Sequence, residues 1–541
     1  MLREEIKQMI PNYLNHCKTI DGRYKVLSKL GEGRYGKVYL CFDLQFETLV
    51  ALKTLLISNI HSNLKNFFNE VLTLAKISSF DSSLRIPKIL DFNLNGLDDQ
   101  GKLSVYYVME FIEMGELNAV LEPNDFISEK LACFFFRQIC DNLLILHSNN
   151  LLHLDLKPEN ILMDANGNLY LCDFGSSTFL IRGDSLKSSG IEFGTKIEGI
   201  PSNECLKLST DSNSSKRKKI ANKANRKLQK KNFKDSCMNF SNKDFDHFIR
   251  HTKFMTTPGY AAPEMTDFEE FQNLAKTDKN LNSENDAPNL SKLDVFSLGV
   301  ILFYVVMKSQ PFQCASLSDV YYKRLNGDKE SFWKIFAKLR TVSKEFKDIV
   351  IDALQMTNKN RLDLLSIYQH NWMIKHFPTD DHFNKTHMNI NSLKRTNTYN
   401  YDKNSPGYTL ASHFGPEGRL DDEQVSSKNS MMMVNQSEQK LANDIHLGQE
   451  LSNLINSRKA KILEKIEADL KLKEQQHKAK SSKSKYNFKL MSTIPFVTEF
   501  IQKHSHKILL LKKHISSDSQ ESLESVLSSS SDEGSSGGEG R

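Results

Sequence analysis

The feature that most limits what this chain can fold into is a glycine-rich turn followed by one lysine in an apolar strand. Glycines occupy positions 31, 33 and 36, and Val38 begins a stretch of strand-forming residues. Glycine lets backbone N–H groups approach phosphate oxygens because no Cβ is in the way. Lys53 ends the β-type segment 50–53, where a charged side chain is costly unless it is paired. The pattern predicts a strand–turn–strand that holds phosphates, although a glycine-rich hairpin without a ligand would share the turn.

Glu70 is the expected partner of Lys53. It lies in the segment 67–74, where apolar residues recur at helical spacing. An acid in an amphipathic helix is also compatible with an ordinary exposed position. Together with the turn and the strand lysine, the acid favours a nucleotide site.

A second group of polar residues follows a predicted helix further along the chain. Asp155, Lys157 and Asn160 alternate with apolar anchors, and an Asn-Gly pair at residues 166–167 predicts a two-residue hairpin. Because this hairpin returns the chain, Asn160 and Asp173 are expected to meet at one end of a strand pair. Oxygen ligands at that place suit Mg²⁺, which takes one or two protein carboxylates plus phosphate oxygens.

Five motifs occur in the order found in eukaryotic protein kinase catalytic domains, and the chain resembles that family over about two thirds of its length, residues 24–377. The motifs are Gly31-x-Gly33-x-x-Gly36-x-Val38, Ala51-x-Lys53, His153-x-Asp155-x-Lys157-Pro-Glu-Asn160, Asp173-Phe-Gly175 and Ala262-Pro-Glu264. The resemblance implies an α+β bilobal fold. A small, mainly β N-lobe would cover about residues 24–112, and a larger, mainly α C-lobe about residues 113–377.

The resemblance also implies ATP and Mg²⁺ as cofactors. It makes Asp155 the acceptor of the hydroxyl proton, Lys157 a contact of the γ-phosphate, and Asn160 and Asp173 the magnesium ligands. Met109 would be the gatekeeper. The implied ATP-binding residues are Leu30, Gly31, Gly33, Gly36, Val38, Ala51, Lys53, Glu70, Met109, Glu110, Ile112, Glu116, Leu162 and Asp173. Among these, Val38, Ala51 and Leu162 would sandwich adenine, and the backbone of Glu110 and Ile112 would contact its edge.

The sequence Lys157-Pro-Glu resembles the serine/threonine class, so the implied reaction is γ-phosphate transfer to Ser or Thr hydroxyls of proteins, the EC 2.7.11 class. Thr257 resembles the threonine that bonds both Asp155 and Lys157 in that class. Glu116 and Glu159 match acids that contact basic residues of substrates in basophilic relatives. Since Tyr304 stands where the usual companion of Glu159 would be, a preference for basic motifs is only partly indicated.

Three further residues resemble structural positions of the family. Asp294 matches the aspartate that braces the catalytic loop, and Arg361 matches the arginine that pairs with Glu264. Arg361 and the segment 370–372 are most similar to the calcium/calmodulin-dependent group of kinases.

One departure from the family pattern concerns regulation. Leu154 replaces the arginine that normally pairs with a phosphorylated activation-loop residue, and the usual phosphosite falls on Lys253. Both partners of that ion pair are missing, so we expect activity that does not need standard activation-loop phosphorylation. The alternative is a catalytically weak pseudokinase that uses its insertion and tail for docking, which Leu154 and the insertion favour and the intact polar motif residues oppose.

The kinase-like region is interrupted by a polar insertion at about residues 181–252, which is expected to be disordered. Residues 216–234 hold ten Lys or Arg residues and no acid. Their spacing is compatible with nuclear import or with a solvated basic run. The run contains a single aromatic residue, near its end, and no specific nucleic-acid contact is expected.

Two segments flank this region, an N-terminal extension at 1–23 and a low-complexity tail at 378–541. The tail contains candidate helices at about 442–478 and 496–515. The second is basic and amphipathic, a pattern that fits a calmodulin target, a membrane surface, an autoinhibitory contact with the kinase's own groove, or an incidental helix.

The remaining composition restricts the compartment. The longest apolar run, 295–307, is shorter than the roughly 18 residues needed to cross a bilayer, and the start lacks the apolar stretch of a secretory signal. The 8 cysteines form no C-x-x-C pair, which favours reduced thiols. We therefore expect an intracellular protein, cytoplasmic or nuclear. Cys172, next to Asp173, is expected to face the ATP site or to be a small buried apolar residue.

Overall fold

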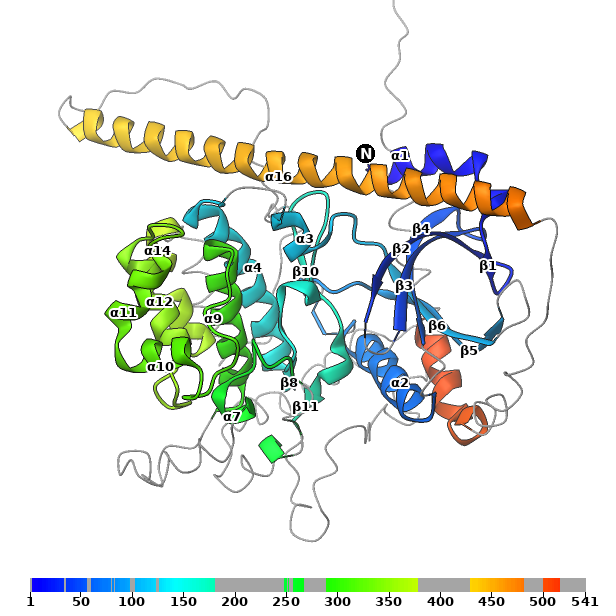
Figure 1. Ribbon diagram of the computed structural model, residues 1–541, viewed down its shortest axis with the longest axis horizontal. Coiled ribbons are helices and arrows are strands. Elements are labelled where there is room, and N and C mark those ends of the chain that lie inside the picture. Colours follow the sequence, from blue (N-terminus) through cyan, green and yellow to red (C-terminus); the bar gives the residue numbers. More distant parts are fainter. Residues whose placement is uncertain are drawn as a thin grey trace, which may run out of the picture. The chain divides into compact units, whose positions relative to one another are not determined.

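The computed structural model describes residues 2–33, 36–55, 60–78, 80–81, 83–97, 103–122, 126–180, 248–250, 252, 256–266, 289–377, 429–480 and 500–515. These residues form two compact units. Unit 1 comprises residues 1–123, 162–175 and 454–541, and unit 2 comprises residues 124–161 and 176–453. Unit 1 contains a six-stranded β-sheet together with helices, and unit 2 is mainly α, which is the α+β, two-part architecture expected from the sequence (Figure 1).

Unit 1 is built on a six-stranded antiparallel sheet. Its strand order is β1-β2-β3-β4-β6-β5. The strands are β1 (Thr19–Ile20), β2 (Tyr24–Glu32), β3 (Gly36–Asp43), β4 (Thr48–Leu55), β5 (Ile89–Leu97) and β6 (Leu103–Glu110). The register pairs Val38 with Lys53 and Lys53 with Tyr107. Adjacent strands thus bring the glycine-rich turn and the lysine together.

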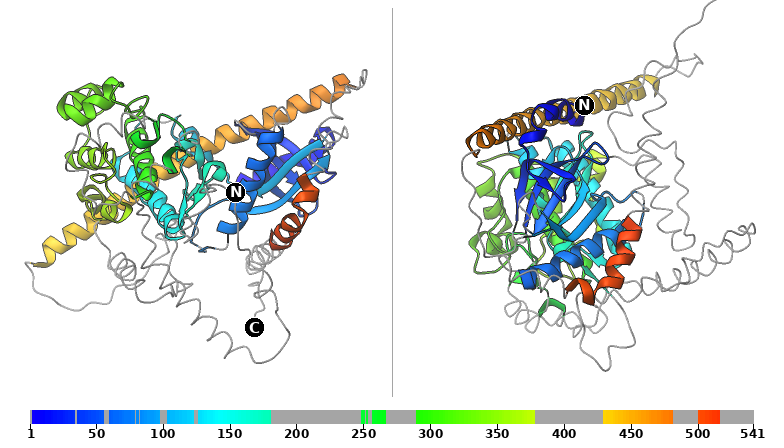
Figure 2. Two further views of the ribbon diagram at one scale, coloured as in Figure 1. Left: turned by 90° about the horizontal axis from the view of Figure 1, so that it is seen from below. Right: turned by 90° about the vertical axis from the view of Figure 1, so that its right-hand side faces the viewer.

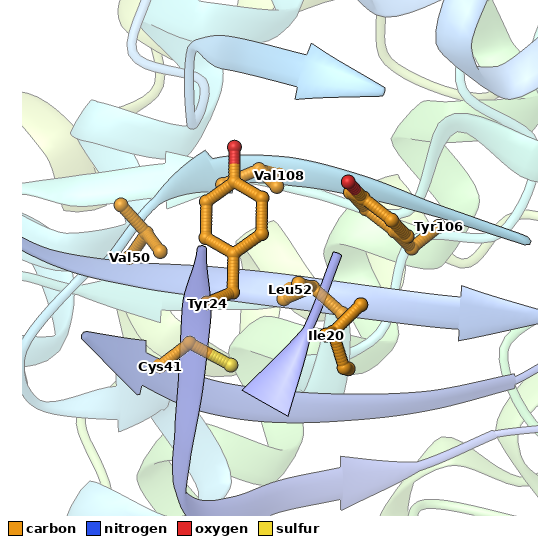
Figure 3. Close-up of a cluster of buried hydrophobic side chains, with 7 residues drawn as sticks. All are labelled: Ile20, Tyr24, Cys41, Val50, Leu52, Tyr106 and Val108. Carbon is orange, nitrogen blue, oxygen red and sulfur yellow. The ribbon is translucent and has the colours of Figure 1, made fainter. Parts of the chain in front are cut away.

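Aromatic and branched side chains fill one core of this sheet. Figure 3 shows the seven buried residues of this cluster, which are Ile20, Tyr24, Cys41, Val50, Leu52, Tyr106 and Val108. The rings of Tyr24 and Tyr106 meet edge to face, with centroids 5.7 Å apart. Their hydroxyl groups donate to Asp91 and Asp21, respectively. Each tyrosine therefore buries its ring while its polar group stays satisfied.

Unit 1 also contains helices and a small three-stranded sheet. Helix α2 (Ile60–Ile77) contacts β4 and β5, and α1 (Leu2–Met9) leads through the 3₁₀ turns η1 (Ile10–Asn12) and η2 (Leu14–His16) into β1. A three-stranded sheet has the order β10-β9-β7, with β7 (Gly115–Glu116), β9 (Ile161–Met163) and β10 (Leu169–Leu171). Helix α3 (Leu117–Leu121) follows β7. Unit 1 includes residues up to 123, and within it β7 pairs with β9.

The long helix α16 (Asn429–Lys480) continues across the sequence boundary between the units, and its part from residue 454 onward belongs to unit 1. Figures 1 and 2 show this part lying alongside α1, where Lys459 forms an ion pair with Glu5. Residues 500–503 and 505–515 are also helical. They lie beside α2 in both figures, and the Phe68 ring lies 5.6 Å from that of Phe500.

Unit 2 is an assembly of helices around α9 (Ser291–Met307), which is buried on nearly all sides and contacts α4 and α12. The other elements of this unit are α4 (Glu129–Ser148), β8 (Leu151–Leu152), η4 (Pro158–Asn160), η5 (Phe174–Ser176, which begins in unit 1), β11 (Thr178–Phe179), α7 (Pro263–Thr266), α10 (Val320–Gly327), α11 (Lys329–Phe336), α12 (Lys344–Ala353), α13 (Leu364–Tyr368) and α14 (Asn371–His376). Within the described part of the chain, no helix combines the length and the apolar character that a bilayer crossing requires.

Candidate active site

Lys53 is the centre of the polar cluster in unit 1. Strand β4 delivers it into the sheet interior, where its Nζ lies 2.7 and 2.9 Å from the two carboxylate oxygens of Glu70. Tyr107 donates its hydroxyl to the same carboxylate at 2.9 Å. The Oδ1 atom of Asp173 lies 3.5 Å from Lys53 Nζ. Lys53, which was predicted to need a partner, thus has two carboxylates beside it, those of Glu70 and Asp173. The structure brings together three residues from separate parts of the sequence.

The electrostatics of this cluster favour a charged lysine. Burial alone disfavours the ammonium form, but the nearby Asp173 and Glu70 carboxylates outweigh it and raise the pKa of Lys53 well above its ordinary value. The side chain of Asp173 is 40% exposed, while that of Glu70 is 4% exposed. Lys53 is therefore a fixed cation with one buried and one solvent-accessible carboxylate beside it.

The glycine-rich turn joins β2 to β3, which pair through Gly31 and Val38. The N–H of Gly33 donates to the carbonyl of Gly36 at 2.9 Å. A Cβ on Gly36 would lie 1.9 Å from the carbonyl oxygen of Thr54, so only glycine fits there. This close approach explains one glycine of the motif by packing against the neighbouring strand.

The predicted adenine residues are distributed over adjoining strands of unit 1. Ala51 pairs with Met109 across β4 and β6, and Leu162 pairs with Glu116 across β9 and β7. Ile112 follows the end of β6 and is buried. An ideal Cβ on Gly31 would lie 3.7 Å from Glu116 Oε1, which places that carboxylate beside the start of the glycine-rich turn.

Cys172 precedes Asp173 and is partly exposed. Burial raises the pKa of its thiol above the ordinary value, and the Asp173 carboxylate adds to this effect. A thiol held protonated in this way is a slow nucleophile.

Sequence reasoning missed two arginines that reach the segment after β6. Arg3 of α1 donates through Nη2 to the carbonyl oxygen of Phe111 at 2.7 Å, and its Nε donates to the Glu113 carboxylate. Arg458 of α16 donates through Nε to the carbonyl oxygen of Met114 at 3.0 Å. No local motif marks either arginine, because their positions depend on how α1 and α16 pack.

In unit 2, Asp155 is the centre of a second polar cluster. Its Oδ1 accepts from the N–H and the hydroxyl of Thr257 at 3.0 and 2.6 Å, and its Oδ2 accepts from Lys157 Nζ at 2.8 Å. Lys157 also donates to Thr257 Oγ1 at 3.0 Å. Asn160 donates through Nδ2 to the backbone carbonyl of Asp155 at 2.7 Å. Thr257 and Lys157 thus hold the Asp155 carboxylate in one orientation, and Asn160 holds the backbone of the same loop.

Asp294 holds the loop that carries Asp155. Its carboxylate accepts from the N–H groups of His153 and Leu154 at 2.9 and 2.8 Å and lies 2.8 Å from His147 Nε2. Burial alone would raise the pKa of Asp294, but the hydrogen bonds from His147 and the loop outweigh it and lower the pKa. Leu154 is buried with φ of +66°, a strained conformation for this residue that the two anchored N–H groups maintain.

Arg361 and Glu264 form an ion pair that is fully buried. Both Glu264 oxygens lie 3.0 Å from Arg361 Nη2, and neither side chain has exposed surface. The guanidinium also donates to the backbone carbonyls of Lys292, Gln355 and Met356. This pair braces α7, which carries Glu264.

Several predicted features fall outside the described residues, namely Lys253, most of the insertion with its basic residues 216–234, and residues 516–541 of the low-complexity tail. Among the described residues at the end of the predicted insertion, Phe248, Ile249 and Thr252 are buried. Thr252 donates its hydroxyl to the carbonyl of Phe248 at 2.9 Å.

The comparison with protein families supplies the deciding observation. Residues 24–194 and 236–373, more than half of the chain, match the model of the protein kinase domain. This chain belongs to the protein kinase family. The two units are accordingly the two lobes of a bilobal kinase fold, and ATP binding and phosphoryl transfer are the activities of the family as a whole.

Similar curated proteins are named as kinases, some of them as serine/threonine-protein kinases. CBL-interacting serine/threonine-protein kinase 19 of Arabidopsis thaliana is 26% identical over 68% of this chain and 58% of its own length. NUAK family SNF1-like kinase 2 of Homo sapiens is 32% identical over 34% of this chain and 27% of its length. MAP3K epsilon protein kinase 2 of Arabidopsis thaliana is 30% identical over 33% of this chain, and the match spans only 12% of that relative.

Proposed function

We propose that this kinase transfers the γ-phosphate of ATP to serine or threonine hydroxyls of protein substrates. The observation that carries the proposal is that both polar clusters have the partners such chemistry needs. In unit 1, Lys53 is paired with Glu70 and next to Asp173. In unit 2, Asp155 is oriented by Lys157 and Thr257. Both clusters consist of residues matched to the family motifs.

The residues of unit 1 suit a nucleotide triphosphate with magnesium. Lys53 supplies a permanent positive charge for phosphate oxygens, and Asp173 supplies an exposed carboxylate for a cation. Asn160, in unit 2, uses its Nδ2 as a donor, so its Oδ1 is the atom that a cation would use. Bound magnesium neutralises phosphate charge as the phosphoryl group moves.

Asp155 is the proposed acceptor of the proton from the substrate hydroxyl. Thr257 and Lys157 hold its carboxylate, which orients a lone pair toward an incoming hydroxyl group. As the hydroxyl oxygen bonds to the γ-phosphorus, the bond to the ADP oxygen breaks and ADP leaves with that electron pair. In this proposal, Lys157 balances charge on the transferred group.

The proposed preference for serine or threonine, and for basic residues around them, rests on the resemblance of the sequence to the family. The Lys157-Pro-Glu sequence and the Thr257 contacts support serine or threonine as the acceptor. Glu116 and Glu159 would favour substrates with basic residues. Relatives named as CBL-interacting, MARK and NUAK kinases support the resemblance to the calcium/calmodulin-dependent group.

A phosphotransfer assay tests the proposal. The full-length protein, Mg-ATP and a library of basic peptides should give phosphoserine and phosphothreonine. Asp155→Asn should lower the rate by about 10²–10⁴-fold, the range for a general base, while the exposed Glu330→Gln stays at the wild-type rate. Thermal unfolding should be unchanged in both variants. A wild-type rate no higher than that of Asp155→Asn would favour the alternative, a pseudokinase scaffold.

We also propose that the basic helix at 500–515 serves as an intrachain contact. Phe68 of α2 lies against Phe500 and His504, and Leu511 and Ile515 are buried. Because α2 carries Glu70, this contact favours the kinase's own surface over calmodulin as the partner of the helix. Deleting residues 496–541 tests it: a changed rate supports the contact, whereas an unchanged rate together with calcium-dependent calmodulin binding supports the other reading.

A further inference from the structure

We propose that Arg3 and Arg458 are positioning residues that set how strongly the segment after β6 binds the adenine ring. The inference rests on the proposed function and on the expectation, drawn from the family resemblance, that the backbone of Ile112 contacts the edge of adenine. All the residues involved belong to unit 1.

Arg3 acts on the peptide group that contains the N–H of Ile112. The carbonyl of Phe111 and the N–H of Ile112 belong to one planar amide. Arg3 donates to that carbonyl at 2.7 Å, so a cation polarises the amide from the side opposite its N–H. A charged donor on the carbonyl makes the N–H of the same amide a stronger donor, because linked hydrogen bonds polarise one another. Ile112 thereby becomes a better donor toward an acceptor nitrogen.

The placement of Arg3 is specific. Leu2 and Ile6 are buried on the inner face of α1 and hold the helix against the unit. The Nε and Nη2 atoms of Arg3 lie on the same edge of the planar guanidinium. From this edge, Nε donates to the Glu113 carboxylate and Nη2 donates to the Phe111 carbonyl. The carboxylate fixes the plane of the guanidinium and thus its direction toward the amide.

Arg458 reaches the same residue by a second route. It donates to the carbonyl of Met114 at 3.0 Å. The N–H of Gly115 belongs to that amide and donates to the carbonyl of Ile112 at 3.3 Å. The N–H of Met114 is held by the carbonyl of Met163 at 2.9 Å. Arg458 therefore strengthens the bond that fixes the Ile112 carbonyl, while Arg3 strengthens the Ile112 donor.

The two arginines come from elements that depend on each other. Arg3 and Arg458 lie 108 and 344 residues along the chain from the carbonyls that they bind. Helices α1 and α16 are joined next to these arginines by the Glu5–Lys459 ion pair. Docking of α1 and α16 is thus coupled to the shape of the adenine contact.

The test compares ATP with 1-deaza-ATP, in which a C–H group replaces the N1 acceptor. Binding of each to the full-length protein is measured by calorimetry with Mg²⁺. Arg3→Gln should weaken ATP binding by about twofold, because it removes the polarising charge but leaves the Ile112 donor in place, and 1-deaza-ATP binding should change much less. Arg458→Gln should weaken ATP binding by a smaller factor than Arg3→Gln, because it acts through one more hydrogen bond.

Matched variants separate this effect from misfolding. Lys7→Gln on α1 and the exposed Lys465→Gln on α16 should bind ATP like the wild type. Arg3→Lys keeps a cation and should fall between the wild type and Arg3→Gln. Thermal unfolding identifies any variant that has lost its fold. If Arg3→Gln does not fold, ATP affinity is measured on Arg3→Lys instead. At saturating ATP the phosphotransfer rate should be unchanged, so that only KM rises.

Two results would overturn the inference. One is an Arg3→Gln protein with wild-type ATP affinity. The other is an equal loss for ATP and 1-deaza-ATP, which would mean that the arginine only supports the fold. If the wild type binds ATP more tightly than 1-deaza-ATP, and Arg3→Gln reduces this difference, the inference is supported even if no peptide is phosphorylated. Failure of phosphotransfer is therefore distinguishable from failure of the adenine contact.

Discussion

Two buried ion pairs of similar chemistry lie in the two units and differ in their surroundings. Lys53–Glu70 in unit 1 has the 40% exposed Asp173 beside it, whereas Arg361–Glu264 in unit 2 is fully enclosed. Backbone carbonyls take up the other donors of Arg361. A third carboxylate that reaches solvent is what a ligand site needs, and complete enclosure is what a structural brace needs. The comparison teaches that burial of a charge pair alone does not indicate catalysis.

The largest effect is expected at the structural pair. Arg361→Met leaves Glu264 buried without its cation and should cost about 3–5 kcal/mol of unfolding free energy. The double variant Arg361→Met/Glu264→Met removes both charges and should recover most of that loss. Urea unfolding followed by far-ultraviolet circular dichroism measures both variants. A double variant as unstable as the single one would show that the backbone contacts, not the charge, matter.

The second prediction concerns Lys53. Lys53→Met should lower phosphotransfer by about 10²–10³-fold, the loss typical of one electrostatic contact to the reacting group. Its unfolding free energy should fall less than that of Arg361→Met, because Tyr107 still donates to Glu70 and Asp173 reaches water. Rate and urea unfolding are measured on the same protein. A stability loss equal to that of Arg361→Met would remove the distinction between the two pairs.

The third prediction uses acid to test a structural carboxylate of unit 2. Burial alone would raise the pKa of Glu129, but His376, Ser343 and Trp372 outweigh it and lower the pKa to about 2. Ser343 and Trp372 donate to the carboxylate directly. Because the carboxylate is favoured in the folded state, its contribution is complete above the unfolded pKa near 4.5 and disappears as the pH falls toward 2.

Between pH 5 and pH 2 the wild type should therefore lose on the order of 3 kcal/mol more than Glu129→Gln. Urea midpoints at several pH values measure the difference. Parallel pH profiles for the two proteins would mean that Glu129 does not keep its low pKa in solution.

The smallest effect is expected in the activation segment. Thr252 is buried and bonded to the Phe248 carbonyl, and Leu154 cannot pair with a phosphate. Thr256→Ala should leave the phosphotransfer rate within about twofold of the wild type, as is usual for substitutions away from such features. Mass spectrometry should show that the active protein does not carry phosphate on Thr252 or Thr256. Loss of activity in a folded Thr256→Ala protein that still binds ATP would contradict this hypothesis.

Much of the fold could be predicted from the sequence because its signals are local. The expected α+β, two-part kinase architecture is confirmed. A stretch of strand-forming residues predicted a strand next to the glycine turn, and the Asn-Gly pair predicted the hairpin now seen between β9 and β10. The end of the first unit was less predictable, since the pairing of β7 with β9 joins segments about 50 residues apart.

The candidate site divides in the same way. Residue types such as Lys53, Asp155 and Asp173 are marked by motifs, and the structure brings Lys53 next to Asp173 within unit 1. Arg3 and Arg458 carry no motif. Their contacts with the Phe111 and Met114 carbonyls exist only after α1 and α16 have docked. Long-range packing of this kind leaves no periodic trace near either arginine.

The sequence by itself determined which chemical groups are available and the order in which they occur: a strand lysine, an acid on a helix, and a loop with Asp155 and Asn160. Tertiary structure alone decided their environments. It enclosed Arg361 with Glu264, left Asp173 open to water, and held Leu154 at a positive φ through the buried Asp294. The physical reason is that the free energy of a charged group depends on the local dielectric, and that both charged groups and strained backbone depend on their hydrogen-bond partners. Those partners come from segments that only the folded chain brings together.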